Sequence, residues 1–235
     1  MKNSDQITLG LIAARKNSKG VKNKNLLFIK NKPITKIAIN LALKCSEIDY
    51  VLLSSDSKKI LQLSNNKKII KINRSKKLSL DKTPMVPVIA DAIKYFEKNL
   101  KKKVSKVVLF DPTSPLRKIE DIKKAIKYFE KKTPDLLCSV NEASHNPYFS
   151  MLEKNKKFFN LPKYSNKNPG SRQSVPLVYE INTIVWIYSR NAIMKIKKRI
   201  PKKTLIFKTK KKRSIDIDTK DDINKIKFYL NNYEK

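Results

Sequence analysis

Glycine is unusually scarce in this sequence, which has three glycines among 235 residues, at positions 10, 20 and 170. Ordinary usage of about 7% would give about 16 in a chain of this length. Glycine is required where φ is positive or where a side chain would block a close backbone approach. We therefore expect Gly20, which lies inside a cationic loop, to shape a backbone cradle. Chance placement of the few glycines is the alternative interpretation.

Cysteine and long apolar runs are also scarce. Cys45 and Cys138 lie in apolar segments without metal-type spacing, so we expect buried, reduced thiols and neither a disulfide framework nor a zinc site. No uninterrupted apolar run approaches the ~18 residues that span a bilayer, and no N-terminal stretch has the pattern of a signal peptide. We expect a single-domain, soluble, cytoplasmic protein with no membrane partner.

Acidic residues are greatly outnumbered, because 54 Lys and Arg against 20 Asp and Glu give a formal net charge of +34. Such a charge is typical of nucleic-acid-binding proteins. Lysine, however, is spread over every segment, and only 101–103 and 208–213 form clusters, which usually are solvated surface. Most Tyr and Phe fall in apolar helix or strand patterns, not between cations on one face. We expect no nucleic-acid partner, and a basic nucleic-acid-binding module remains the alternative from a different functional class.

Arginine is rare among the cations, with seven of 54. Its planar guanidinium can donate two parallel hydrogen bonds, which the lysine ammonium cannot match. Arg15, Arg117 and Arg172 lie in polar stretches. We expect these three positions to be places where a two-pronged donor is needed.

Apolar runs of strand length alternate with stretches of helical periodicity, which predicts an α/β fold with a mostly parallel sheet and helices on both faces. Strands are expected near 7–14, 50–55, 68–73, 106–113, 136–140, 182–189 and 204–209, and helices near 33–45, 87–100, 119–132, 191–198 and 219–232. The pattern loosens at about 144–176, where prolines interrupt aromatic residues. We expect an excursion there, a small β-lobe for dimerisation or for covering a substrate, in which the lone His145 has only a loop role.

Polar segments at the expected strand ends predict the site, because ligands of open α/β sheets bind beyond the carboxyl ends of the strands. These segments are ARKNSKG, SSDS and DPTSPLR, and SIDIDT near the C-terminus is grouped with them. The first is neither a Walker A nor a G-x-G-x-x-G sequence. Its backbone amides, the Ser18 hydroxyl and the cations Arg15 and Lys19 suit a triphosphate, and Asn25 could bind a base or a phosphate oxygen.

The SIDIDT segment supplies two carboxylates, Asp216 and Asp218, separated by one residue. In an extended segment both would project from the same face. Hard divalent cations prefer such oxygen ligands, so the pair predicts a Mg²⁺ site that bridges to a nucleotide phosphate. A surface acidic pair near a helix start is the alternative.

Five segments, in this order along nearly the whole chain, resemble the cytidylyltransferases that make CMP-activated nonulosonic acids, the CMP-sialic acid synthetase family. They are ARKNSKGVKNKN, SSDS, DPTSPLR, SRQSVPLVYEIN and SIDIDT. The resemblance implies a Rossmann-like nucleotidyltransferase fold, a homodimer and Mg²⁺ as the cofactor. It also implies that CTP condenses with an eight- or nine-carbon keto-sugar acid, with release of pyrophosphate, in the biosynthesis of surface polysaccharides.

The resemblance also implies a role for individual residues. The nucleotide would be bound by Ala14, Arg15, Ser18, Lys19, Gly20 and Asn25, and the metal by Asp216 and Asp218. The catalytic set would be Arg15, Lys19, Asn25, Asp216 and Asp218. The sugar acid would be faced by Asp111, Arg172, Gln173 and Asn182.

Two departures from the family pattern bear on the sugar acid. Asp111 replaces the glutamine that is usual in the sialic acid enzymes, and Thr183 stands where glycine is frequent. Together with the stretches at 146–149 and 172–176, Asp111 favours the branch that acts on legionaminic acid. Sialic, pseudaminic and 3-deoxy-octulosonic acids remain alternatives. For Asp111 itself the alternative is a carboxylate that caps the following turn.

Overall fold

The computed structural model describes residues 6–18, 20–162 and 171–233, with Arg172 and Tyr233 described by their backbones. Its centre is a seven-stranded sheet in the order β11-β7-β10-β6-β1-β4-β5. The strands are β1 (Ile7–Ala13), β4 (Tyr50–Ser55), β5 (Ile69–Asn73), β6 (Val104–Leu109), β7 (Leu136–Glu142), β10 (Tyr179–Ser189) and β11 (Thr204–Lys208). β10 runs antiparallel to both β6 and β7, and the other pairings are parallel. The predicted mostly parallel sheet is confirmed.

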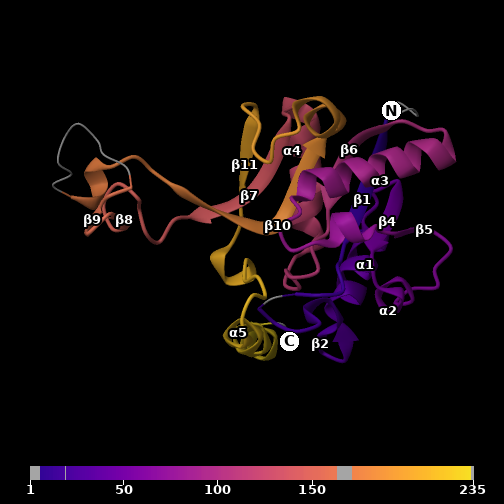
Figure 1. The fold of residues 1–235 in the computed structure, drawn as a ribbon, viewed down its shortest axis with the longest axis horizontal. Helices are drawn as coiled ribbons and strands as arrows, with labels where there is room; N and C mark the ends of the chain where they lie inside the picture. The colour runs from indigo at the N-terminus through magenta and orange to yellow at the C-terminus, as the bar shows by residue number, and fades with distance from the viewer. Residues whose placement is uncertain (1–5, 19, 163–170, 234–235) are drawn as a thin grey trace.

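Helices cover both faces of this sheet, as predicted (Figure 1). The α-helices are α1 (Ile34–Lys44), α2 (Lys58–Leu61), α3 (Met85–Leu100), α4 (Ile119–Lys132) and α5 (Lys220–Tyr233). On one face, Ile89 and Phe96 of α3 are buried with Leu11 of β1. On the other, Ile39 of α1 and Ile126 of α4 belong to a second apolar cluster. Burial on both sides explains why the strands are nearly continuous apolar runs.

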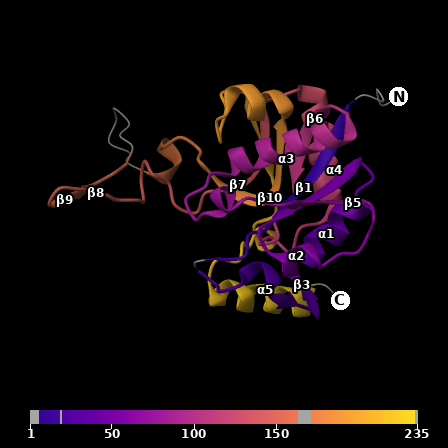
Figure 2. The ribbon, with the colours of Figure 1, turned by 45° about the vertical axis from the view of Figure 1, so that its right-hand side comes forward.

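A third apolar cluster holds the C-terminal helix in place. Ile226 and Leu230 of α5 pack with Ile29 of β2 (Phe28–Ile29) and with Ile217, which is fully buried. β2 pairs with β3 (Lys32–Pro33) in a short hairpin, and Figures 1 and 2 show α5 lying beside this hairpin. This packing brings the chain just before α5 back to the opening loop.

The short elements complete the description. They are the 3-10 turns η1 (Lys24–Leu26), η2 (Lys76–Ser79), η3 (Arg172–Ser174) and η5 (Lys211–Arg213), the π-helical turn η4 (Ala192–Ile196), and the strands β8 (Glu153–Asn155) and β9 (Phe158–Asn160). The helix expected near 191–198 is therefore a single π-helical turn, which ends at Lys197 with a left-handed φ of 58°.

The described residues between β7 and β10, 143–162 and 171–178, leave the sheet and extend away from it as an arm (Figure 1). β8 and β9 form a separate two-stranded sheet in this arm. Large apolar side chains there are open to solvent, with Leu152 68%, Phe158 73% and Phe159 59% exposed. An arm with so much exposed apolar surface is unusual for an isolated chain.

The scarcity of cysteine and of long apolar runs led to two predictions that can be compared with the structure directly. Cys45 and Cys138 are buried and form no disulfide, and burial raises the pKa of the Cys45 thiol to about 11, so the expected buried thiols are confirmed. Among the described residues, no helix has the length and apolar character needed to cross a membrane.

Candidate functional site

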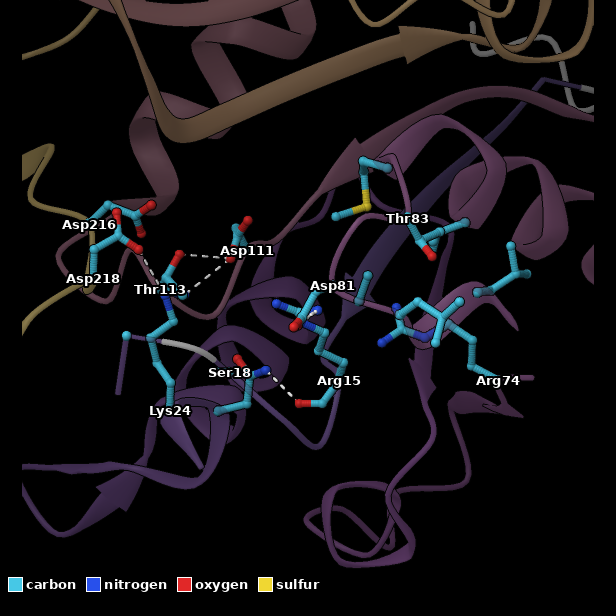
Figure 3. A pocket seen from close by; sticks show the side chains of 17 residues that line it. Arg15, Ser18, Lys24, Arg74, Asp81, Thr83, Asp111, Thr113, Asp216 and Asp218 are labelled. Carbon is cyan, nitrogen blue, oxygen red and sulfur yellow. Dashed lines mark hydrogen bonds and ion pairs between the residues drawn. The ribbon is translucent and has the colours of Figure 1, made fainter. Parts of the chain in front are cut away.

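A cavity of about 410 Å³ lies at the carboxyl ends of the parallel strands (Figure 3). Three strand ends contribute to it. Arg15 and Ser18 follow β1, Arg74 follows β5, and Asp111 follows β6. Of the expected polar segments, the first (ARKNSKG, after β1) and the third (DPTSPLR, after β6) contribute side chains to this cavity. The second, SSDS, supports the site from outside the cavity, because the Asp56 Oδ1 accepts a 2.7 Å hydrogen bond from the backbone N–H of Lys16.

Side chains of different chemical type line different parts of the cavity. Figure 3 shows Asp216, Asp218 and Lys24 gathered at one end and Arg74 at the other. The Arg15 guanidinium lies between them. Leu78, Leu80, Met85 and Val88 add apolar surface to the cavity lining. The cavity therefore offers an acidic end, a cationic middle and an apolar wall.

The acidic end depends on the burial of Ile217. Its N–H donates a 3.0 Å hydrogen bond to the carbonyl oxygen of Thr113, and its side chain is held in the α5 cluster. The flanking carboxylates, Asp216 and Asp218, both line the cavity. We expected the segment to be extended and placed it among the strand ends, but it is an irregular stretch between η5 and α5, brought to the sheet edge by the packing of α5.

Asp216 has the electrostatics of a cation ligand. Burial raises its pKa, and the negative charges of Asp111 and Asp218 raise it further. Its Oδ1 is buried without a hydrogen-bond partner among the described residues. The Lys24 ammonium lies 2.9 Å from Asp218, measured from Nζ to Oδ1, and its positive charge opposes the rise in the Asp216 pKa. A buried carboxylate oxygen without a partner is costly unless a cation or a ligand satisfies it.

Asp111 lies between two cavities. It lines the first, and it also lines a second cavity of about 180 Å³ together with Thr183, Trp186 and Arg199. Its Oδ1 accepts hydrogen bonds from the N–H (3.2 Å) and the hydroxyl (2.9 Å) of Thr113. The turn-capping alternative for Asp111 is therefore present in the structure, through one of its two oxygens.

Arg117 makes its hydrogen bonds within the protein, through one nitrogen of its guanidinium. The guanidinium Nη2 donates to the carbonyl oxygens of Asp111 at 3.1 Å and Thr183 at 2.6 Å, and the guanidinium lies 5.8 Å from the centre of the Phe110 ring. Burial lowers the pKa of Arg117 to about 10, which still leaves it protonated at neutral pH. It ties the loop after β6 to β10, which is a positioning role.

The opening loop is held by Asn25. The buried Asn25 donates a 2.9 Å hydrogen bond from Nδ2 to the carbonyl oxygen of Arg15, and its own carbonyl accepts the Thr35 hydroxyl at 2.6 Å. Ala14 is buried, and its N–H donates to Ser54 at 3.0 Å. Lys19 lies outside the described residues. Asn25 lines the cavity, but its amide first of all fixes the course of the loop.

Gly20 makes the close approach that the scarcity of glycine predicted. A Cβ added there would lie 2.2 Å from the carbonyl oxygen of Asp218, and its φ is not positive. The absence of a side chain therefore lets the cationic loop touch the acidic segment. The cradle expected for a ligand is in part a contact between two segments of the chain.

Among the described side chains expected to face a sugar acid, Asp111, Gln173 and Asn182 do not line one cavity together. Asn182 donates from Nδ2 to Asn141 and Thr209, and its Oδ1 accepts from Ser139 and from the N–H of Ile184. These bonds satisfy polar groups where the register between β10 and β7 shifts. Gln173 is exposed in η3, on the arm, and the Arg172 side chain is not described. Neither Asn182 nor Gln173 is among the residues that line the two cavities.

Arg74 is the principal site residue that the sequence analysis missed. It is 6% exposed, it lines the cavity, and its Nε donates a 3.1 Å hydrogen bond to the Ser79 hydroxyl. Burial lowers its pKa, while the charge of Asp56 opposes that change. Arg74 directly follows β5, so the strand-end rule, applied to the third expected strand, would have found it. Lys24, Asp81, Thr83 and Thr113 also line the cavity and were not assigned.

Comparisons with known proteins agree with this geometry. Residues 9–234 match the family model described as cytidylyltransferase. The chain is 29% identical over 221 residues to the CMP-N,N'-diacetyllegionaminic acid synthase of Campylobacter jejuni, with 93% of each chain covered. It is 27% identical over 215 residues to the N-acylneuraminate cytidylyltransferase of Streptococcus agalactiae serotype III, covering 90% of this chain and 50% of the relative. The chain thus spans about half the length of that streptococcal relative.

A solved structure shows the same fold. It is the CMP:2-keto-3-deoxy-manno-octonic acid synthetase complexed with CTP, which aligns with a TM-score of 0.68 and 13% identity over 96% of this chain and 99% of that chain. At this identity the likeness concerns the fold alone.

Proposed function

The chain belongs to the cytidylyltransferase family, and from this we propose that it transfers CMP from CTP to the anomeric hydroxyl of a nonulosonic acid of the legionaminic or sialic type, with release of pyrophosphate. The observation that carries the proposal is the single cavity in which a cationic loop, an acidic pair and a buried arginine meet. The relatives named for legionaminic and N-acylneuraminic acids support the substrate class. The same chemistry on pseudaminic or 3-deoxy-octulosonic acid is the alternative.

The sorting of side chains suggests how CTP lies in the cavity. We place the base against the apolar wall, where Arg74 and Thr83 offer polar contacts. The α-phosphate lies at the acidic end beside Lys24, and the β- and γ-phosphates turn back over Ser18 and Arg15 (Figure 3). This order puts the α-phosphorus near the acidic end, where the sugar hydroxyl attacks in line with the departing pyrophosphate.

The acidic end fits a Mg²⁺ ion. Asp216 and Asp218 would hold it, and Asp111, whose charge acts on Asp216, is a third carboxylate at this end of the cavity. The described residues contain no preformed group of three or more His, Cys, Asp or Glu that could bind a metal by themselves, so phosphate oxygens would complete the ligands, as is usual for Mg²⁺. When bound, the ion would neutralise negative charge on the phosphate oxygens. Lys24 and Arg15 contribute fixed positive charge along the same phosphate chain.

The sugar acid is proposed to lie next to Asp111, at the junction of the two cavities. Both hydrogen bonds from Thr113 to the Asp111 side chain go to Oδ1, so we assign recognition of the sugar to Oδ2. An ionised carboxylate only accepts hydrogen bonds, whereas glutamine both donates and accepts. Legionaminic acid carries an additional acylamino N–H at C7, which gives such an acceptor a partner.

We expect a higher kcat/KM for legionaminic acid than for sialic acid, and Asp111→Gln should narrow this gap by roughly ten- to hundredfold. The reason is that the wrong sugar leaves a buried polar group unpaired. The measurement is pyrophosphate release with CTP, Mg²⁺ and a panel of legionaminic, sialic, pseudaminic and octulosonic acids. Glu180→Gln is the matched control, because it removes the same charge from an exposed position on β10.

Three outcomes of this assay would count against the proposal. Equal use of both sugars by the unmodified protein would remove Asp111 from sugar recognition. A preference for another acid of the panel would change the substrate and keep the reaction. No turnover with any acid, together with tight DNA binding at physiological salt, would favour the nucleic-acid module.

Gly20→Ala should lower kcat/KM by about ten- to hundredfold with little change in melting temperature. The added Cβ would meet the backbone of Asp218 at 2.2 Å, and a displacement of about 1 Å in a site can cost that much activity. Gly10→Ala is the control, because its Cβ would meet Ile48 Cγ2 at 2.9 Å in the apolar interior. We expect Gly10→Ala to lower the melting temperature and to leave kcat nearly unchanged. A reversal of these two effects would contradict the role of Gly20.

Three wider proposals follow from the family. The protein is a homodimer of single-domain subunits, and the arm, with its exposed Leu152, Phe158 and Phe159, packs on the second subunit or covers the sugar acid. The enzyme works in the cytoplasm, where CTP is made. Its cofactor is Mg²⁺, and neither nucleic acid nor a membrane is a partner.

A further inference from the structure

An internal ion pair occupies the cationic middle of the cavity. Arg15 Nη1 lies 2.5 Å from Asp81 Oδ1, and the two side chains are 29% and 39% exposed. Both residues line the cavity, and Figure 3 shows them between the acidic end and the Arg74 end. The proposed path of the phosphate chain therefore crosses a guanidinium that already holds a carboxylate.

Asp81 belongs to a segment that contributes to the cavity repeatedly. It lies between η2 and α3, and Leu78, Leu80, Thr83 and Met85 of the same stretch line the cavity too. In the sequence Asp81 and Arg15 are 66 residues apart. The carboxylate is thus presented to Arg15 by a different wall of the cavity from the loop that carries the arginine.

We propose that Asp81 is an internal competitor of polyphosphate for Arg15, a specificity-determining residue that weakens the binding of pyrophosphate and of the pyrophosphate portion of CTP. This inference rests on the proposed function. Carboxylate and phosphate oxygens accept the same N–H donors of a guanidinium, so a phosphate takes the Arg15 N–H that now points at Asp81 only after Asp81 has left. Once it has left, two anions face each other across the cavity, which adds repulsion.

The replacement of Asp81 by pyrophosphate on Arg15 affects the direction of the reaction. The nucleotide sugar product keeps one phosphate, whereas pyrophosphate is the group that would occupy Arg15. When Asp81 returns to Arg15, it takes the place of the leaving pyrophosphate and favours its release. Asp81 therefore lowers inhibition by pyrophosphate, at the cost of a somewhat higher KM for CTP.

The backbone of the loop has anchors other than Asp81. The carbonyl oxygen of Arg15 accepts the buried Asn25 amide at 2.9 Å, and the N–H of Ala14 donates to Ser54 at 3.0 Å. Removing the Asp81 charge therefore frees the guanidinium without releasing the backbone that carries it. This separation makes an affinity measurement informative.

The test is the equilibrium binding of inorganic pyrophosphate and of CMP, measured by titration calorimetry with Mg²⁺ present. We expect Asp81→Asn to bind pyrophosphate about two- to fivefold tighter, the modest effect of a half-exposed ion pair, and to bind CMP with unchanged affinity. The gain should disappear in the Arg15→Gln background, since a double-mutant cycle isolates the pair. Asp91→Asn is the matched control, because it removes the same charge from α3, outside the lining of this cavity.

Several results would overturn the inference. Pyrophosphate binding that is unchanged or weaker in Asp81→Asn would make Asp81 a ligand or a neutral neighbour. The affinity could instead rise equally for CMP, rise equally in Asp91→Asn, or still rise without Arg15. Any of these results would show that the effect comes from the total charge of the protein and not from the Arg15–Asp81 pair. The proposed function fails differently, through absence of CTP binding and of pyrophosphate release by the unmodified protein with every sugar acid.

Discussion

Asp216→Asn lowers kcat by about two to three orders of magnitude and leaves the melting temperature unchanged or higher. The loss of activity is expected because a carboxylate that holds a metal supplies several kcal/mol of transition-state stabilisation. The retained stability is expected because Asp216 is partly buried near two other carboxylates and its buried Oδ1 has no hydrogen-bond partner among the described residues. Removing such a charge relieves an unfavourable interaction in the folded protein. A residue with only a structural role would change both quantities in the same direction.

Asp218→Asn should also reduce kcat by orders of magnitude, since it flanks the same buried Ile217. Asp221→Asn is the matched control, because this carboxylate lies three residues farther on, exposed in the first turn of α5. Turnover at limiting Mg²⁺ and thermal unfolding without Mg²⁺ are the two measurements. Near wild-type turnover in both Asp216→Asn and Asp218→Asn would remove the metal from these residues.

Helices and strands were predictable where a short stretch of sequence shows by itself which side chains are buried. In α4 the apolar residues Ile122, Ala125, Ile126 and Phe129 recur at helical spacing and are the buried ones. β1 is apolar except for Thr8, and it is buried almost throughout. The antiparallel direction of β10 was not predicted, because it depends on how the arm returns the chain to the sheet. Periodicity specifies which face of an element is buried, but not the direction in which a distant strand re-enters.

The sequence predicted the residue types that form the site better than it predicted the contacts that those residues make. The strand-end rule found the loop of Arg15 and the segment of Asp111. It could not show that Ile217 would be buried under α5 and so carry Asp216 to the sheet edge, since that depends on packing against β2, far away in the sequence. Asn182 illustrates a second gap in what the sequence reveals. A polar residue near the expected site proved to satisfy the irregular pairing of β10, and the sequence contains no signal that separates these two uses of an amide.

Lys24→Met should lower kcat/KM by about two to three orders of magnitude. Lys24 begins η1, directly after Asn23 in a left-handed conformation with φ of 55°, and this turn directs its side chain into the cavity. The side chain is 14% exposed, and its Nζ lies 2.9 Å from Asp218 Oδ1. A fixed cation in such a shielded place stabilises charge that develops on phosphate oxygens, and the loss of one such donor typically costs a hundred- to thousandfold.

The division of this effect between kcat and KM tests the role of Lys24. If Lys24 acts on the transition state, kcat and kcat/KM fall together, whereas an increase in KM alone would mean that it binds CTP equally well before and during reaction. Lys22→Met is the matched control, since Lys22 lies in the same loop, carries the same charge and is exposed. Lys24 could instead serve only to neutralise Asp218. In that case Lys24→Met would lower the melting temperature. The double variant Lys24→Met with Asp218→Asn would then recover the wild-type melting temperature but not the activity. Equal kinetic effects of Lys22→Met and Lys24→Met would show that the loop acts through its total charge and that the position of the Lys24 ammonium does not matter.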